Sequence, residues 1–288
     1  MKILVLGGTR YFGRHLIESL LAKGHDVTVA TRGNNEIPFS SKVQFVKSDR
    51  KNQDDLKKLA ELGPFDILYD QICMSGMDAH IAVLAFRDQC KRYIFTSTGS
   101  VYDFQNDHAL VESDFNPKNY KINLGATQPT DYQEDKRQAE AVFSEQSNFP
   151  VAMVRFPIVL GEDDYTARLK FHISRIINNE EIYFPRLETQ MAFIRSDEAG
   201  EFLSFLGEQS FTGPVNAASN GAIALGELVG LIELANNKKA KLVDTKTALN
   251  ASPFGSEVDF VMSNKLANEL GFKFLNLREY LGRLVVLS

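Results

Sequence analysis

Short apolar runs alternate with amphipathic stretches along the first half of the chain. The apolar runs predict buried strands at residues 3–6, 26–31, 43–47, 66–72, 92–98 and 151–156. The amphipathic stretches between them predict helices at residues 14–23, 54–62, 78–90 and 132–146. Strands that alternate with helices over short connections form parallel sheets with helices on both faces. The pattern therefore predicts an α/β fold with a doubly wound parallel sheet.

The second half of the chain is less regular. Its pattern predicts helices at residues 167–178, 196–207 and 276–284 and from Leu225, with strands at 191–194 and near Val215. We expect a Rossmann-type sheet domain at residues 1–160, to which segments near 190–220 return. Residues 161–288 then form most of a smaller C-terminal lobe.

A glycine turn joins the first predicted strand to the first predicted helix, with the sequence GGTRYFG at residues 7–13. Such a turn lets the backbone approach a pyrophosphate, which the free N–H groups and dipole of the helix N-terminus stabilise. The strand–turn–helix context separates this turn from a chance glycine pattern. We predict a dinucleotide site here, and the alternative is a tight turn without a ligand. The contact residues expected from the turn are Gly7, Thr9, Arg10, Tyr11, Phe12 and Gly13.

The end of the second strand favours NADP over NAD. NAD-specific enzymes carry an acidic residue there for the ribose 2′-hydroxyl, but this chain has Thr31 followed by Arg32. Arg32 and Arg10 together favour a 2′-phosphate, because a guanidinium binds phosphate through two parallel hydrogen bonds. NAD remains the alternative if Arg32 is only a solvated loop residue. Asp49, just past the third strand, is placed to accept a hydrogen bond from the adenine amino group.

A second group of candidates follows later strands. Hydroxyl residues close the strand at 92–98, and ligand chemistry in such sheets lies beyond the carboxyl ends of the strands. Tyr132 and Lys136 are four residues apart, so a helix places them on one face. A neighbouring cation favours phenolate and so turns a Tyr into a usable base. The predicted catalytic set is Thr98, Tyr132 and Lys136, and the remaining predicted cofactor contacts are Ile72, Thr96 and Lys136.

These features together resemble the extended short-chain dehydrogenases/reductases, the NAD-dependent epimerase/dehydratase family. The resemblance is carried by the glycine turn, Asp49, the TSTGSVY strand end at 96–102 and Tyr132 with Lys136. Segments 154–161, 193–199, 215–217 and 263–271 are similar to later landmarks of that family. The resemblance implies that residues 1–160 bind NAD(P) and that the C-terminal lobe binds substrate. It also implies that Tyr132 is the acid/base, with Lys136 holding the nicotinamide ribose and Thr98 orienting the substrate.

Three departures from that family bear on function. Arg10 replaces the middle glycine of the turn, residues 70–73 read DQIC instead of a His-Ala-Ala stretch, and Ile158 replaces an Asn that helps to bind nucleotide-sugars. The chain is similar here to a divergent branch that includes the chloroplast stem-loop RNA-binding proteins, in which the catalytic pair is degraded. This chain retains Tyr132 and Lys136, which favours redox chemistry.

We therefore expect an NAD(P)-dependent oxidoreductase or epimerase that transfers hydride to or from a small, sugar-like substrate. The alternative is a non-catalytic dinucleotide-binding regulator or RNA-associated protein on the same fold. The sequence leaves the identity of the substrate open, and equally whether the enzyme is an epimerase or a dehydrogenase. Dehydration is disfavoured, because Gly99 rather than an acidic residue follows Thr98.

Composition limits the kinds of binding partner and the cellular location that we expect for this protein. With 32 Lys+Arg against 37 Asp+Glu the net charge is −5, so we do not expect a general nucleic-acid binder. Two cysteines outside any metal-binding spacing predict reduced thiols and no metal site, and no apolar run is long enough to span a bilayer. We expect a cytoplasmic protein. The helix at 78–90 is apolar all round, which a homodimer partner and a neighbouring helix would explain equally well.

Overall fold

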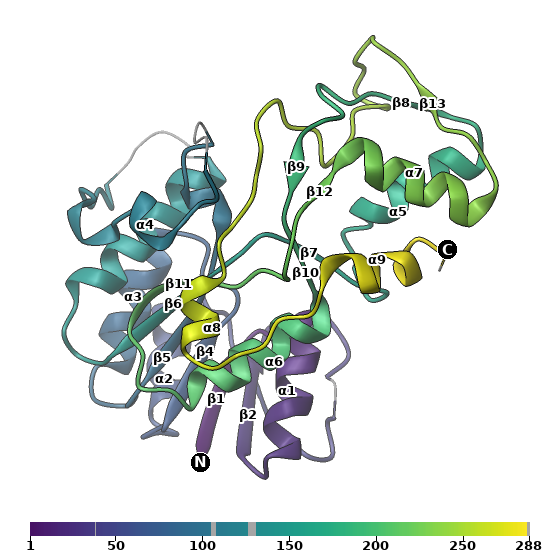
Figure 1. Ribbon diagram of the computed structural model, residues 1–288. Helices are drawn as coiled ribbons and strands as arrows, with labels where there is room; N and C mark the ends of the chain where they lie inside the picture. Colours follow the sequence, from purple (N-terminus) through teal and green to yellow (C-terminus); the bar gives the residue numbers. More distant parts are fainter. Residues whose placement is uncertain (38, 105–107, 126–130, 287–288) are drawn as a thin grey trace. The chain divides into compact units, whose positions relative to one another are not determined.

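The computed structural model describes residues 1–37, 39–104, 108–125 and 131–286 (Figure 1). The chain divides into two compact units. The first unit comprises Met1–Asp103, Glu112–Phe156 and Asp197–Ala217. The second comprises Phe104–Val111, Pro157–Ser196 and Ala218–Ser288.

A parallel sheet of seven strands forms the centre of the first unit, in the order β11-β6-β5-β4-β1-β2-β3. Leu6, at the end of β1, pairs with Ala30 of β2 on one side and with Asp70 of β4 on the other. The strand order reverses at β1, and loops beyond such a switch point diverge to leave a crevice. The predicted doubly wound parallel sheet is confirmed. The strands are β1 (Lys2–Leu6), β2 (Asp26–Thr31), β3 (Gln44–Lys47), β4 (Ile67–Asp70), β5 (Tyr93–Thr98), β6 (Val151–Phe156) and β11 (Gly213–Asn216).

Helices cover both faces of this sheet. On one face α1 (Phe12–Ala22) packs beside α6 (Ser196–Gly207), where the Ser19 and Ser204 hydroxyls are 2.9 Å apart. On the other face α2 (Gln53–Ala60), α3 (Gly76–Phe86) and α4 (Tyr132–Glu145) pack side by side. Their apolar side chains share one buried cluster with β1, β4 and β5. Short 3-10 helices lie at Gly99–Val101, Glu112–Asp114 and Pro117–Asn119.

Helix α3 differs in its bounds from the helix predicted at 78–90. It begins at Gly76, because the Ser75 hydroxyl accepts a hydrogen bond from the Asp78 N–H at 3.2 Å and caps the helix, and it ends at Phe86. Its small residues pack inward, whereas Met77 and Leu84 are 45% and 42% exposed. Burial within the monomer therefore accounts for only part of the apolar surface of α3.

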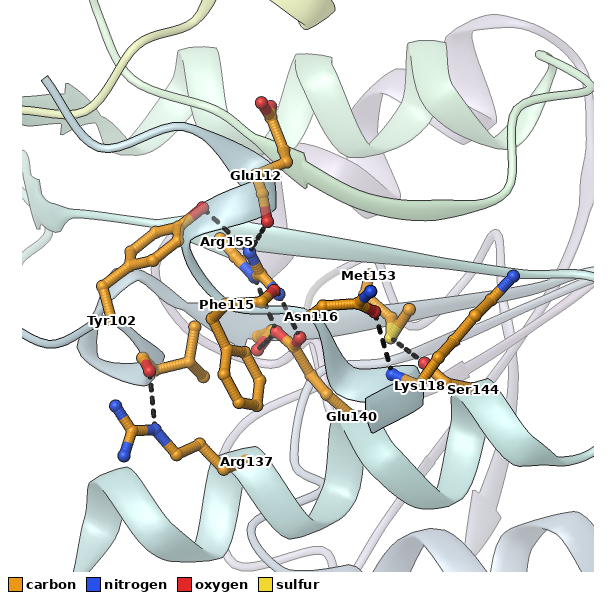
Figure 2. A network of polar contacts seen from close by, with 12 residues as sticks. Tyr102, Glu112, Phe115, Asn116, Lys118, Arg137, Glu140, Ser144, Met153 and Arg155 are labelled. Atoms are coloured by element: carbon orange, nitrogen blue, oxygen red, sulfur yellow. Dashed lines mark hydrogen bonds and ion pairs between the residues drawn. The ribbon is translucent and has the colours of Figure 1, made fainter. Parts of the chain in front are cut away.

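A buried ion pair joins α4 to the end of β6 (Figure 2). The Arg155 guanidinium donates through Nη2 to Glu140 Oε2 at 2.6 Å and through Nε to Glu140 Oε1 at 3.0 Å, and both side chains are fully buried. The remaining polar atoms are also satisfied. Arg155 donates to the Tyr102 hydroxyl and to the Glu112 and Phe115 carbonyls, and Glu140 accepts from the Ser97 hydroxyl at 2.5 Å. The pair thus fixes α4 against β5 and β6.

The described residues of the second unit form short strand pairs and helices. The pairs are β7 (Ile158–Leu160) with β10 (Phe193–Arg195), β9 (Gln190–Met191) with β12 (Ile223–Ala224), and β8 (Glu181–Ile182) with β13 (Lys241–Leu242). The helices are α5 (Arg168–Ile177), α7 (Leu225–Asn236), α8 (Lys265–Glu269) and α9 (Leu277–Leu284). No helix among the residues described is long and apolar enough to cross a membrane.

His172 lies in the core of the second unit. Its ring stacks on Phe254 at 4.7 Å and on Phe184 at 5.4 Å between ring centroids. Its Nδ1 is 2.9 Å from the Arg168 carbonyl and its Nε2 is 2.8 Å from the Ser252 hydroxyl. Burial lowers the pKa of His172 to about 4, because the imidazolium cannot be solvated there.

This buried histidine makes the second unit acid-sensitive. The folded state keeps His172 neutral down to about pH 4, whereas the unfolded chain protonates it below its ordinary value of 6.5. Stability is therefore complete above pH 6.5 and falls as the pH drops towards 4, by about 3 kcal/mol in all. Urea unfolding at pH 7, 5.5 and 4 measures this. His172→Gln should lose less stability over that range, and an identical loss in both proteins would contradict the assignment.

The Glu140–Arg155 pair yields a second stability prediction. Glu140→Leu leaves a buried guanidinium without its counter-charge and should lower the free energy of unfolding by about 3–5 kcal/mol. The double variant Glu140→Leu/Arg155→Met removes both charges and should recover most of that loss. Urea unfolding at pH 7 measures both. If the double variant is no more stable than the single one, the unpaired charge is not the cause.

Candidate functional site

A cavity of about 340 Å³ lies in the first unit at the carboxyl ends of β1, β2 and β4 and in the loop after β3. This is the place where the strand order of the sheet reverses, as expected for a ligand site in an open α/β sheet. The residues that line the cavity are Gly7, Thr9, Thr31, Arg32, Asn34, Asn35, Ser48, Asp49, Arg50, Lys51, Ile72 and Met74.

The glycine turn brings backbone rather than side chains to this cavity. Gly7 and Gly8 have φ angles of 93° and 81°, which favour glycine. A Cβ at Gly13 would lie 2.6 Å from the Gly8 Cα, so only glycine lets α1 approach the turn this closely. No side chain in the described part of the chain caps α1. A glycine turn that runs directly into a helix N-terminus is the arrangement that suits the pyrophosphate of a dinucleotide.

The loops after β2 and β3 bring cationic and polar groups to the cavity. Arg32 and Lys51 are exposed there, and Arg10 donates a short hydrogen bond to Asn35 of the cavity wall. Asp49 accepts from the Lys51 N–H at 3.0 Å, and its own N–H donates to Asp55 at 2.8 Å, so both loop ends are fixed. Two guanidinium groups and an ammonium group thus gather at the side where the sequence predicts an adenosine ribose.

Arg50 and Ser48 are lining residues that the sequence reasoning missed. Arg50 is 4% exposed and forms an ion pair with Asp70 at 2.5 Å. The Ser48 hydroxyl is buried and has no hydrogen-bond partner within the part of the chain that the structure describes. One feature of the sequence pointed to this ion pair. Asp70 stands in the DQIC segment that replaces the His-Ala-Ala stretch of the family named above.

Lys136 is buried between two strand ends. It is 3% exposed, and its Nζ donates to the Thr96 carbonyl at 2.9 Å and to the Cys73 carbonyl at 2.8 Å. The ammonium group also lies 4.7 Å from the centroid of the Phe95 ring. Burial lowers the pKa of Lys136, although nearby acidic groups oppose the shift. This cation is therefore held firmly by β5 and by the loop after β4.

Tyr132 is the first residue of α4 and is 48% exposed. Asp131 caps the helix there by accepting from the Glu134 N–H at 2.8 Å. Gln133 donates to the Tyr102 carbonyl at 2.7 Å and Arg137 to the Val101 carbonyl at 2.6 Å, so α4 docks on the segment that follows Thr98. The spacing of Tyr132 and Lys136 puts both on one face of this helix.

The structure brings together only some of the predicted cofactor residues. Those that line the cavity are Gly7, Thr9, Arg32, Asp49 and Ile72. The others take different places. Thr96 is joined to Lys136, Phe12 lies 5.6 Å from Phe156 between ring centroids, and Tyr11 is buried in the turn with a φ of 56°. Thr98 accepts from the Ser100 N–H at 3.1 Å. Thr98 is a predicted catalytic residue rather than a cofactor contact, and the ligand contacts and roles of all the predicted site residues remain predictions.

Comparison with known proteins agrees with this geometry. Residues 3–80, which hold the glycine turn and Asp70, match the model of the NAD dependent epimerase/dehydratase family. Over 116 residues the chain is 34% identical to the chloroplast stem-loop binding protein of 41 kDa b of Arabidopsis thaliana, covering 35% of this chain and 30% of that protein. Vestitone reductase of Medicago sativa is 25% identical over 193 residues, covering 56% of this chain and 58% of its own. The chain thus matches about a third to just over half of each relative's length.

Solved structures share the fold along the whole chain. UDP-glucose 4-epimerase of Thermotoga maritima has a TM-score of 0.79 at 16% identity and covers 100% of this chain and 98% of its own. A dTDP-glucose 4,6-dehydratase of Bacillus anthracis in complex with NAD has a TM-score of 0.78 at 14% identity, covering 99% and 95%. The N-terminal segment of this chain is thus similar to the NAD dependent epimerase/dehydratase family, and the chain as a whole has the fold of these solved proteins.

Proposed function

We propose that this protein is an NAD(P)-dependent oxidoreductase or epimerase. The observation that carries the proposal is the cavity at the point where the strand order reverses, formed by a glycine turn and by the loops that hold Arg32 and Asp49. Its volume of about 340 Å³ is in the range of small-molecule sites, and its lining includes cationic, acidic and hydroxyl side chains. These features suit the adenosine and pyrophosphate of a dinucleotide.

NADP is the cofactor that the charges favour. Arg32 and Lys51 line the cavity, and Arg10 contacts Asn35 in its wall. No acidic residue stands at the end of β2, where a ribose 2′-hydroxyl would need an acceptor. A 2′-phosphate would therefore meet cations rather than a carboxylate.

We propose that Tyr132 is the general acid/base of the reaction. When bound, the nicotinamide ring supplies hydride exchange. Tyr132 holds or releases the proton of the substrate oxygen, and the Thr98 hydroxyl orients that oxygen. The position of Tyr132 supports this role, because it begins α4 one turn before Lys136, whose ammonium group is held by the Thr96 and Cys73 carbonyls. A cation on the same face of the helix would favour the phenolate of Tyr132.

A small, sugar-like molecule is the substrate class that the related proteins suggest. UDP-glucose 4-epimerase of Thermotoga maritima was solved with UDP-glucose, and UDP-N-acetylglucosamine 4-epimerase of Methanobrevibacter ruminantium with UDP-N-acetylmuramic acid. In this chain Ile158 begins β7 in the second unit, where a polar residue would be expected for a nucleotide-sugar. We therefore propose a small, sugar-like substrate, and a substrate screen should compare simple sugars with nucleotide-sugars.

RNA association without turnover is the second candidate function. The observation that favours it is the 34% identity to a chloroplast stem-loop binding protein. The net charge of −5 disfavours it, because phosphate-backbone binding needs a basic surface. RNA binding at low salt that NADP does not displace, together with no turnover in a substrate screen, would favour this candidate over the enzyme.

The cofactor proposal predicts a larger thermal shift with NADP than with NAD. A ligand present at a hundredfold excess over its Kd adds about 2.7 kcal/mol of stability. Arg32→Asp should weaken NADP binding about 10- to 100-fold, because a charged hydrogen bond is lost, while NAD binding is unchanged or improved. Arg87→Asp, an exposed substitution on the α3 end, is the matched control. An unchanged preference ratio in Arg32→Asp would remove Arg32 as the phosphate-binding residue.

The acid/base proposal predicts a split between binding and turnover. Tyr132→Phe should leave cofactor affinity within about twofold and lower turnover by about 10²- to 10⁴-fold, the usual contribution of a general acid/base. Turnover is followed by NADPH absorbance, or by product analysis for an epimerase. Tyr183→Phe, in the second unit, serves as the control. Wild-type turnover in Tyr132→Phe would reject the assignment.

A further inference from the structure

We propose that Arg50 and Asp70 are positioning residues that hold two loops of the cavity in their binding geometry. The inference rests on the proposed function, because it concerns the cavity assigned to the adenosine half of the cofactor. The first loop follows β3 and contributes Ser48, Asp49 and Arg50 to the cavity. The second follows β4 and contributes Ile72 and Met74. One buried ion pair connects them.

Arg50 reaches from the first loop into the second. Its Nη2 donates to Asp70 Oδ2 at 2.5 Å, and its Nη1 donates to the Asp78 carbonyl of α3 at 2.6 Å. Arg50 is 4% exposed and Asp70 is fully buried. Because the guanidinium is planar, its two bonds fix both the distance and the orientation between the loops.

The two acidic residues in turn hold the backbone of the second loop. Asp70 Oδ1 accepts from the Ile72 N–H at 3.2 Å, and Asp78 Oδ2 accepts from the Met74 N–H at 2.9 Å. The Tyr93 hydroxyl donates to Asp70 Oδ2 at 2.6 Å and anchors the carboxylate to β5. The residues that bind Arg50 therefore also place Ile72 and Met74, the two side chains that this loop adds to the cavity.

Charge separates the role of Arg50 from that of the other cavity cations. Arg32 and Lys51 are exposed, whereas the charge of Arg50 is compensated by Asp70 at hydrogen-bond distance. Burial alone would lower the pKa of Arg50, but the Asp70 carboxylate outweighs it and keeps the guanidinium charged. A cation already committed to a carboxylate adds little to the recognition of a phosphate. Arg50 should therefore affect NADP and NAD equally.

Asp70 also accounts for the unusual DQIC sequence at residues 70–73. The acidic residue ends β4, and its partner Arg50 comes twenty residues earlier in the chain. The two charges depend on each other, because either one alone would be buried without compensation. We take the pair as a device of this chain for shaping its cavity.

The experiment measures dissociation constants of NADP and NAD by calorimetry for the wild-type protein and three variants. Arg50→Met/Asp70→Leu removes both charges, so that no buried charge is left unpaired and the fold can persist. Arg50→Lys keeps the charge but cannot make both bonds. Leu206→Ala, a buried residue of α6 on the other face of the sheet, is the control for lost stability alone. Circular dichroism and melting temperature monitor folding.

In the double variant the Kd of both cofactors should rise by at least about tenfold. Arg50→Lys should show a smaller rise. In both variants the ratio of the Kd for NADP to the Kd for NAD should stay unchanged. Leu206→Ala should bind within twofold of wild type at a lower melting temperature. The proposal is overturned if the folded double variant binds within twofold of wild type. If the double variant does not fold, wild-type affinity in Arg50→Lys overturns it equally.

Two further outcomes separate this inference from the proposed function. Arg50→Lys could instead weaken NADP binding more than NAD binding, as is expected for Arg32→Asp. That result would make Arg50 a phosphate-binding residue and overturn the positioning role. If the wild-type protein binds neither NADP nor NAD, the proposed function fails first and the positioning role falls with it. Cofactor binding by the wild type, with no effect in either Arg50 variant, rejects the inference alone.

Discussion

A row of buried charges of alternating sign holds the first unit together near the carboxyl ends of its strands. Arg50 pairs with Asp70 at 2.5 Å, and Glu140 pairs with Arg155 at 2.6 Å. Lys136 stands between the two pairs, and both Asp70 and Glu140 act electrostatically on it. The row links the loop after β3, the end of β4, helix α4 and the end of β6. Two of the loops that line the cavity, those after β3 and β4, are attached to it.

Stability alone does not explain such a row. Burying an ion pair costs several kcal/mol of desolvation for each charge, and well-packed apolar residues often serve a fold as well or better. The buried charges instead make directional hydrogen bonds, which fix the positions of the groups that they join. A guanidinium with two partners, or an ammonium held by the Thr96 and Cys73 carbonyls, fixes a geometry that apolar contacts leave adjustable. The cavity and the catalytic face of α4 are the two places where geometry matters most for the proposed reaction.

The sequence predicts the fold well because the fold follows local patterns. Alternating strands and helices, the glycine turn and the Tyr132/Lys136 spacing are all visible within short windows. The start of α3 was misplaced by two residues, because a cap at Ser75 extends the helix beyond its apolar pattern. Arg50 could not be assigned, because its partners Asp70 and Asp78 lie 20 and 28 residues further along the chain and meet it only in the folded protein. Which groups compensate one another is a tertiary property.

The roles of these cations therefore differ according to whether a carboxylate pairs with each of them and whether it is exposed to a ligand. Arg50 and Arg155 are buried and matched by carboxylates, so their bonds are directed at the protein itself. Arg32 and Lys51 are exposed on the cavity, where their charge is available to a ligand. Lys136 is buried like the first group but is held by carbonyl oxygens rather than by a carboxylate in direct contact. The Asp70 and Glu140 carboxylates act on it from further away, so its charge lies between the two ion pairs, on the same face of α4 as Tyr132.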